Sequence, residues 1–290
     1  MMDGWRKEDP ATTKMLPVEA DVPEAIATLG QQPGATELMR AVGDLALIAF
    51  YFLLRVGEYT TKATRNNSKQ TEEFEMEDIT FFEHNALNQK RQLSRKAADS
   101  SIMNACAATL RLKNQKNGWK NVCIHQDTNG DNYMCPVRAL GRRYVHVRTN
   151  VHDFERSQKH SLSSYFDGTN NNHHVNQEHM SHHLKVAAAV LDYDAGKGIP
   201  IERVNTHSLR GGGANALSLS GYSDRQIQKM GRWKSATFME YIREELGCFS
   251  EGMSTSMKQR FNFVNVAGGA CHDITDTAVT MEYDMNAAAA

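Results

Sequence analysis

Residues 206–243 read T-H-S-L-R-G-G-G-A-N-A-L-S-L-S-G-Y-S-D-R-Q-I-Q-K-M-G-R-W-K-S-A-T-F-M-E-Y-I-R. His207 and Arg210 open this stretch at a spacing of three. On a helix that spacing places both side chains on one face, where they can converge on a single anion. Arginine suits a phosphate because its planar fork donates two parallel hydrogen bonds and keeps its charge.

The middle of the stretch carries helix and turn signals. Three glycines, residues 211–213, are poor helix formers and are expected to let backbone approach something closely. Small and apolar residues then predict a helix that ends near Tyr222. Ser223 and Gln226 form a capping-box pattern, which predicts a second helix that Gly231 ends. Because this pair resembles a helix-turn-helix in outline, a module that only reads DNA is an alternative for the segment.

The end of the stretch offers a nucleophile. Tyr241 follows Trp233 by eight residues, on a helix predicted over 236–244. A phenol has a pKa near ~10 and attacks poorly unless cations stabilise its anion or the transition state. The His/Arg pair, the tryptophan and the tyrosine together suggest covalent chemistry on phosphate. A tyrosine buried in the core is the alternative.

Such chemistry needs a second arginine from elsewhere in the chain. The run A-F-Y-F-L-L-R-V-G-E-Y supplies Arg55, at the C-terminal end of a helix predicted over 36–55. A basic side chain that complements the helix dipole is the alternative for Arg55. Glu58, three residues on, is interpreted as a carboxylate that orients a neighbouring Arg or His, with a surface glutamate as the alternative.

A proton donor is expected on a hairpin. Strand signals at 79–82, 107–113 and 121–126 predict a three-stranded sheet, and the segment K-N-Q-K-N-G-W-K lies between the last two strands. Lys116 is the candidate general acid, because a mobile loop can bring an ammonium group to a leaving oxygen only when DNA is bound. Lys113 is the alternative donor, and a solvated turn lysine is the structural alternative.

The set Arg55, Lys116, His207-x-x-Arg210, Trp233 and Tyr241, in that order, resembles the tyrosine recombinase (phage-integrase-type) catalytic domain. L-L-R-V-G-E-Y is similar to the first arginine box of that family, and H-S-L-R to the second. G-R-W-K-S-A-T-F-M-E-Y-I-R resembles the version in eukaryotic mobile elements such as Cryptons and tyrosine-recombinase retrotransposons. The spacing from Trp233 to Tyr241 is eight, whereas many bacterial members have a spacing of nine at this place, so strict counting would put Arg232 in the slot that we assign to Trp233.

The resemblance implies an α+β, mostly α-helical catalytic domain with a small three-stranded antiparallel sheet. It covers residues 35–247, preceded by an N-terminal arm or linker (1–34) and followed by a C-terminal tail (248–290) that docks onto a neighbouring protomer. The implied activity is site-specific cutting and rejoining of double-stranded DNA through a 3′-phosphotyrosyl bond. The implied assembly is a homo-oligomer, a tetramer on paired sites, and the chemistry requires no cofactor.

Three other functions stay open from the residues. They are a catalytically inactive relative that binds DNA, a type IB topoisomerase-like relaxing enzyme, and a metal-dependent nuclease that uses Glu75, Glu77, Asp78 or the histidines near 179–183. His179 with His182 or His183 has a metal-compatible helical spacing, but no cysteine or carboxylate cluster completes a site, so no metal is expected.

Charge is distributed unevenly along the chain. The net charge is −1 overall, but −7 over residues 1–84 and +9 over residues 85–160. A basic middle third is typical of a face that meets a polyanion. A helix predicted from Pro136 carries part of that charge. The residues expected to contact the DNA backbone are Lys113, Arg138, Arg142, Arg143, Arg232 and Lys234.

The apolar runs and the cysteines indicate in which cellular compartment the protein is expected. No run of 18 apolar residues exists, the N-terminus lacks the apolar region of a signal peptide, and the five cysteines have no C-x-x-C pairing. Reduced thiols in an intracellular compartment are therefore expected, the nucleus if the source is eukaryotic.

Overall fold

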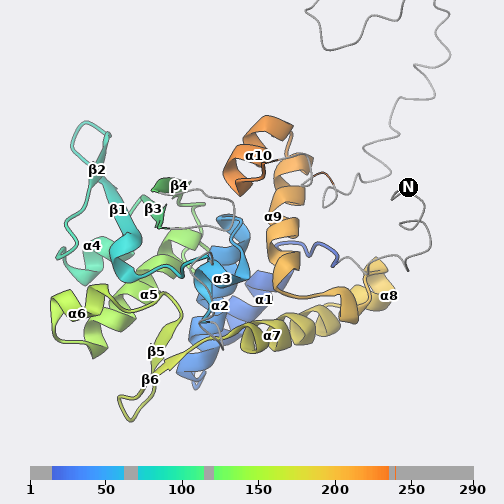
Figure 1. Ribbon diagram of the computed structural model, residues 1–290, viewed down its shortest axis with the longest axis horizontal. Helices are drawn as coiled ribbons and strands as arrows, with labels where there is room; N and C mark the ends of the chain where they lie inside the picture. The colour runs from blue at the N-terminus through green and yellow to red at the C-terminus, as the bar shows by residue number, and fades with distance from the viewer. Residues whose placement is uncertain (1–14, 62–70, 114–120, 235–238, 240–290) are drawn as a thin grey trace, which may run out of the picture. The chain divides into compact units, whose positions relative to one another are not determined.

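The computed structural model describes residues 15–61, 71–113, 121–234 and 239. All of them belong to the first of two compact units, Met1–Arg243. This part is mostly helical with small antiparallel sheets, which confirms the predicted α+β class (Figure 1). Among its helices, none has the length and apolar character that a membrane span needs.

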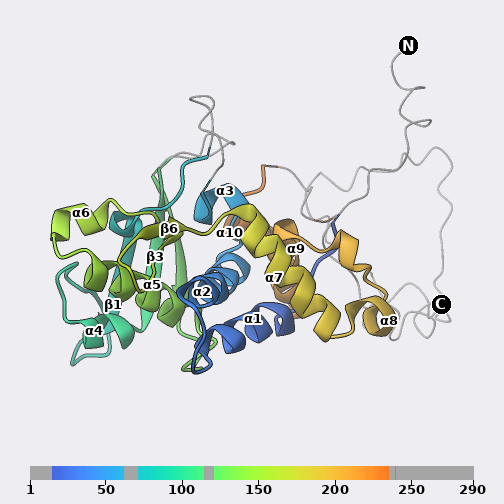
Figure 2. The ribbon, with the colours of Figure 1, turned by 90° about the horizontal axis from the view of Figure 1, so that it is seen from below.

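The centre of the described chain is the helix α2 (Glu37–Tyr51). Thr36 caps its start, since the side chain accepts a hydrogen bond from the Met39 amide. Every residue from Ala41 to Phe50 is buried, because α2 contacts α1, α5, α7 and α9 on different sides (Figure 2). A helix that is apolar all round belongs in a core. The single charged residue in this buried run is Asp44.

The predicted helix 36–55 ends earlier than expected. α2 stops at Tyr51, and Leu53 adopts the left-handed conformation (φ 50°) that turns the chain. Arg55 then becomes the N-cap of the short helix α3 (Val56–Tyr59). The prediction that Arg55 lies at the C-terminal end of the long helix was therefore wrong, and so was the dipole role that depended on it.

The sheet has one strand more than predicted. β1 (Ile79–His84), β3 (Ala107–Leu112) and β4 (Val122–Asp127) match the three predicted strands. β2 (Lys90–Gln92) adds an antiparallel edge, so the order is β2-β1-β3-β4. All three residues of β2 are exposed, so their side chains carried no apolar strand signal. The expected turn at Asn117-Gly118 lies outside the described residues.

The predicted arm, as far as the structure describes it, is a core element. The helix α1 (Asp21–Gln31) buries Val22, Ile26 and Ala27. It packs closely on α2, where a Cβ added to Gly43 would lie 2.9 Å from the Cα atom of Ala27. Residues 15–31 therefore belong to the fold rather than to an extended arm, because their apolar side chains cover one side of α2.

Other predicted helices are confirmed. α5 (Pro136–Asn150) begins at the expected proline. α7 (Gln177–Val190) carries His179, His182 and His183 on one helix, as their spacing predicts, and α10 (Asp224–Gly231) has the predicted Ser223/Gln226 capping box. The remaining elements are α4 (Asp99–Met103), α6 (Phe154–Gln158), α8 (Tyr193–Lys197), η2 (Met76–Asp78), η3 (Ile201–Arg203), and the two-stranded sheet of β5 (Ser164–Phe166) and β6 (Asn172–His174).

The three glycines lie inside α9 (Thr206–Leu219) and permit close packing, as predicted. A Cβ at Gly212 would lie 1.8 Å from the carbonyl oxygen of Val18, and one at Gly213 would lie 2.4 Å from that of Phe50. The backbone they approach is the protein's own. Because these glycines have no side chains, α9 lies directly against the C-terminal half of α2. Arg55 follows that half of α2 in the sequence by four residues.

Candidate functional site

The first part of the site is the N-terminal turn of α9. The Asn205 side chain accepts a hydrogen bond from the His207 amide at 2.8 Å, and Ser208 Oγ accepts one from the Asn205 amide at 3.1 Å. This cap fixes the start of the helix. His207 is exposed, whereas Arg210, one turn later, is 5% exposed. The predicted spacing therefore places both side chains on one helix, where His207 is exposed and Arg210 is buried.

Arg210 is held by the end of α10. Its guanidinium donates a hydrogen bond to the Gly231 carbonyl and lies 4.4 Å from the ring centroid of Trp233. A planar cation over an indole face is stabilised electrostatically. Trp233 in turn presses against Gly231, where an added Cβ would lie 1.6 Å from a ring carbon. The structure thus brings Trp233 and Arg210 together, as the order of the motifs suggested.

Glu58 links the second arginine to the same region. Its side chain is fully buried, and Oε2 accepts hydrogen bonds from the Arg55 amide at 3.0 Å and from Arg232 Nη2 at 2.9 Å. Its other oxygen, Oε1, pairs with Arg55 Nη1 at 3.3 Å. Glu58 is therefore a buried carboxylate that orients Arg55, and the alternative of a surface glutamate is wrong.

Arg232 has a role that sequence reasoning missed. It is 2% exposed, adopts the left-handed conformation (φ 59°) after α10, and turns its side chain inward. Its guanidinium donates to the carbonyls of Phe52 (3.4 Å) and Leu53 (3.1 Å) as well as to Glu58. Carbonyls at a helix C-terminus carry partial negative charge, which a cation stabilises. The prediction that Arg232 contacts DNA was wrong, because its charged group is inside the protein.

The charges of Arg210 and Arg55 both act on the His207 imidazole. Partial burial lowers the pKa of His207, and the charges of Arg210 and then of Arg55 lower it further. Burial also lowers the pKa of Arg232, where Glu58 acts in the opposite direction and Arg55 in the same direction. Charges act on one another only over short distances in salt solution. Contacts link the same residues: Glu58 pairs with Arg55, the N-cap of α3, and with Arg232, and the Gly231 carbonyl next to Arg232 accepts a hydrogen bond from Arg210. We call these two guanidiniums and the imidazole of α9 the Arg55–His207–Arg210 cluster.

Two of the six candidate catalytic residues, Lys116 and Tyr241, lie outside the described residues. The alternative donor Lys113 is described and is held by carboxylates. Its Nζ atom lies 2.6 Å from Glu75, 3.3 Å from Glu77 and 3.3 Å from Asp78. Burial acts to lower the pKa of Lys113, but the hydrogen bond to Glu75 and the neighbouring carboxylate charges raise it above its usual range.

The arginines of α5 point into the protein rather than into solvent. Arg143 is 1% exposed, so its predicted contact with DNA was wrong. Arg142 Nε donates to Asp44 at 2.6 Å, and Arg138 Nη1 donates to the Met103 carbonyl at 2.6 Å. These acceptors come from α2 and α4, the helices that pack on α5. Lys234 is exposed.

No group of three or more His, Cys, Asp or Glu side chains in the described residues has an arrangement that could hold a metal ion. In α7, His183 Nδ1 lies 2.8 Å from the carbonyl oxygen of His179, and the rings of His182 and His183 meet edge to face. These imidazoles therefore interact within their own helix.

Comparison with known proteins gives structural matches only. No protein-family model matches the chain, and no curated protein matches its sequence. One similar structure is the Tn1549 transposon integrase (residues 82–397) in complex with circular intermediate DNA, with 9% identity, a TM-score of 0.42, and coverage of 86% of this chain and 68% of that one. Another is the XerA recombinase, with 15% identity, a TM-score of 0.45, and coverage of 87% and 66%. Identities and scores of this size do not assign an activity to the chain.

Proposed function

We propose that this chain is a site-specific DNA recombinase that cuts and rejoins strands through a covalent bond between a tyrosine and a DNA 3′-phosphate. The observation that carries the proposal is the Arg55–His207–Arg210 cluster. Its members come from positions about 150 residues apart in the sequence, yet Glu58, which holds Arg55, also pairs with Arg232, whose neighbour Gly231 holds Arg210. The lowering of the His207 pKa by both arginines is consistent with this arrangement. The two guanidiniums suit one phosphodiester, whose oxygens accept the paired donors of a guanidinium.

In the proposed reaction, Arg55 and Arg210 bind the non-bridging oxygens of the scissile phosphate. They stabilise the charge that builds up when five oxygens surround the phosphorus. Glu58 pairs with Arg55, and the Trp233 ring packs against Arg210, so both guanidiniums are held in place. Since each guanidinium is already held by protein contacts, little reorganisation is needed when the phosphate binds.

Tyr241 is the proposed nucleophile. Its hydroxyl oxygen forms a bond to phosphorus while the bond from phosphorus to the 5′-oxygen breaks, and His207 accepts the phenolic proton. A pKa below the usual histidine value favours the neutral imidazole, the form that can accept a proton. Lys116 donates a proton to the departing 5′-oxygen. Attack by a 5′-hydroxyl on the phosphotyrosine reverses these steps and rejoins the strand.

The assignment to a mobile element, the assembly into a tetramer on paired sites and a nuclear location belong to the same proposal. They follow from the resemblance of the Arg55, His207-x-x-Arg210, Trp233 and Tyr241 motifs to the recombinases of eukaryotic mobile elements. A recombinase joins strands from two sites, so more than one copy must act on the paired DNA.

The decisive experiment traps the covalent intermediate. The chain is incubated in EDTA with a pool of nicked duplexes from which the 5′-hydroxyl fragment diffuses away after cleavage. We expect a denaturant-resistant protein–DNA species with the wild type and with Tyr133→Phe, an exposed tyrosine used as the matched control. We expect none with Tyr241→Phe or Arg210→Met.

Other outcomes would select another function. DNA binding without any covalent species would identify an inactive binding protein. A covalent species with relaxation of supercoils but no exchange between two sites would identify a topoisomerase-like enzyme. Cleavage that EDTA abolishes would identify a metal-dependent nuclease. A covalent species that survives Tyr241→Phe would contradict the proposed nucleophile.

A further inference from the structure

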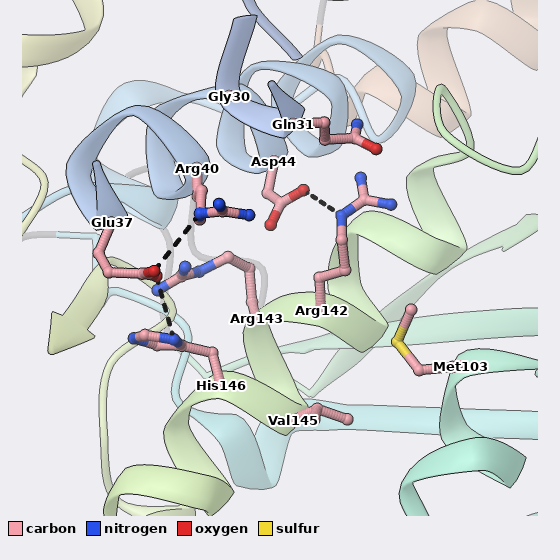
Figure 3. A pocket seen from close by; sticks show the side chains of 10 residues that line it. All are labelled: Gly30, Gln31, Glu37, Arg40, Asp44, Met103, Arg142, Arg143, Val145 and His146. Carbon is pink, nitrogen blue, oxygen red and sulfur yellow. Dashed lines mark hydrogen bonds and ion pairs between the residues drawn. The ribbon is translucent and has the colours of Figure 1, made fainter. Parts of the chain in front are cut away.

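A second basic site lies between α1, the N-terminal half of α2, and α5. A cavity of about 410 Å³ opens there, and Figure 3 shows three arginine side chains around it: Arg40, Arg142 and Arg143. From Arg40 to Tyr51 the helix α2 rises eleven residue steps, roughly 16 Å at ~1.5 Å per step, so the cavity is separate from the Arg55–His207–Arg210 cluster. The proposed recombination chemistry does not use it.

Two of the arginines already have carboxylate partners. Arg142 Nε pairs with Asp44 Oδ1 at 2.6 Å, and Arg40 Nε pairs with Glu37 Oε1 at 3.4 Å. Burial raises the pKa of Asp44, while the charge of Arg142 lowers it. These pairs leave the third arginine as the excess positive charge of the cavity.

Arg143 is that third arginine, and its surroundings are unusual. It is 1% exposed, and its Nη2 donates to the Ser164 carbonyl. Within the described part of the chain, its buried Nε has no hydrogen-bond partner and its guanidinium has no carboxylate within ion-pair distance. The charges of Asp44 and Glu37 oppose the lowering of its pKa by burial, but these carboxylates already pair with Arg142 and Arg40. Burying an unpaired charge is costly unless a counter-charge accompanies it. The side chain therefore indicates an anion as the occupant of the cavity.

The other titratable wall group adds no positive charge at neutral pH. Burial, and then the charges of Arg143 and Arg40, lower the pKa of His146 to about 4. Its Nε2 accepts a hydrogen bond from the Phe166 amide at 2.9 Å, which also requires the unprotonated nitrogen. Three guanidiniums and two carboxylates thus leave one net positive charge, which matches a monoanion better than a dianion.

The remaining wall includes the apolar side chains of Met103 and Val145, together with Gly30 and the amide side chain of Gln31. A cavity of a few hundred Å³ with apolar walls and a few convergent polar groups is the usual setting for a small organic ligand. We propose that this cavity binds a small organic monocarboxylate, whose carboxylate pairs with Arg143 and whose apolar body contacts Met103 and Val145. The planar carboxylate matches the fork of a guanidinium, whereas a phosphate dianion would place a second negative charge beside Glu37 and Asp44.

The test uses the full chain without DNA, and so does not depend on the proposed recombination. Benzoate, its neutral isostere benzamide and inorganic phosphate are titrated at constant ionic strength, by calorimetry and by thermal unfolding. We expect benzoate to bind and to raise the melting temperature as its concentration rises, because a ligand of the folded state stabilises it. We expect benzamide and phosphate to bind at least 10-fold more weakly. Equal binding of benzoate and benzamide, or stronger binding of phosphate, would overturn the proposal.

Three variants locate the site. Arg143→Met should weaken benzoate at least 10-fold, whereas Arg91→Met, an exposed arginine on β2, should leave it unchanged. If Arg143→Met does not fold, Met103→Trp provides the test, since it fills the cavity from the opposite wall and keeps every charge. Undiminished benzoate binding in Met103→Trp would show that the ligand sits elsewhere and would end the proposal. If a carboxylate of a second copy of the chain fills the cavity instead, the protein would be a dimer that benzoate dissociates. That result would also overturn the proposed small-molecule site.

Discussion

Arg232 Nη2 donates a hydrogen bond to Glu58 Oε2 at 2.9 Å, across 174 positions of the chain. Both side chains are almost completely buried. The same carboxylate holds Arg55, while the two neighbours of Arg232 in the chain supply the Gly231 carbonyl and the Trp233 ring that hold Arg210. This one ion pair therefore joins the supports of the two arginines in the candidate site.

Removing the guanidinium of this pair should destabilise the fold. In Arg232→Met, the buried Glu58 carboxylate loses one of its donors and three backbone carbonyls, those of Phe52, Leu53 and Met230, lose theirs, which costs roughly 3–5 kcal/mol. We expect that decrease in the free energy of unfolding by urea denaturation. Arg225→Met, an exposed arginine of α10, should change it by less than about 0.5 kcal/mol. Glu58→Gln combined with Arg232→Met should cost less than the sum of the single changes. Additive effects would mean that the pair does not act as a unit.

Adding one methyl group at Gly231 should displace Trp233. The new Cβ would lie 1.6 Å from a carbon of the Trp233 ring, so the indole must leave Arg210. We expect Gly231→Ala to lose about 1–3 kcal/mol of stability and to change the tryptophan fluorescence. Gly168→Ala, where an added Cβ meets nothing within 4 Å, is the control. The double variant Gly231→Ala with Trp233→Ala should show no further loss from the alanine at 231. A full loss in that background would place the clash somewhere else.

The pKa of His207 should depend on the positive charges of Arg55 and Arg210. Because the positive charges of Arg210 and Arg55 help to lower this pKa, Arg55→Met should raise it toward the usual histidine value. A titration of His207 followed by NMR measures the change, with Arg91→Met as a control that removes a distant positive charge. An unchanged pKa in Arg55→Met would mean that the two side chains do not meet in solution, and it would remove the main support for the proposed phosphate site.

His146 should make stability depend on pH. Its pKa is lowered to about 4 in the folded protein, against an ordinary value of 6.5. Below pH 6.5 the unfolded chain takes up this proton more readily, so its contribution to stability is complete above pH 6.5 and is lost as pH falls toward 4. We expect the wild type to lose about 2–3 kcal/mol more over that range than His146→Gln does. Urea unfolding at pH 7, 5.5 and 4 measures this loss. His152→Gln, at an exposed position, should behave like the wild type.

The proton donor can be identified by changing the leaving group. If Lys116 protonates the 5′-oxygen, Lys116→Met should slow cleavage of ordinary DNA but not of DNA with a 5′-bridging sulfur, because a thiolate leaves without a proton. Lys113→Met should instead lower stability, since the buried carboxylate of Asp78 loses a partner, and sulfur should give no specific rescue. Rescue of Lys113→Met by sulfur would assign the donor role to Lys113.

Several elements could be predicted because their signals are local. The start of α5 at Pro136 and the Ser223/Gln226 cap of α10 depend on residues within one turn of each other. The strands β1, β3 and β4 carry runs of apolar and β-branched side chains. The exposed strand β2 has no such run and pairs through its backbone, so its sequence could not reveal it. The glycines of α9 indicate a place of close approach, but the sequence does not show that the approaching groups are the protein's own carbonyls.

The sequence by itself determined the mostly helical α+β class, the position of most helices, and the spacing that puts His207 and Arg210 on one helix. Only the tertiary structure decided which charged side chains are buried. In the sequence, Arg232 and Arg143 resemble surface arginines, yet each is buried. The turn after α2 presents the Phe52 and Leu53 carbonyls to Arg232, and the Ser164 carbonyl of β5 accepts a hydrogen bond from Arg143. Burial of a charge depends on partners that are distant in sequence, such as Glu58 and Ser164. No pattern along the chain encodes those partners, whereas helix caps and strand alternation act between near neighbours.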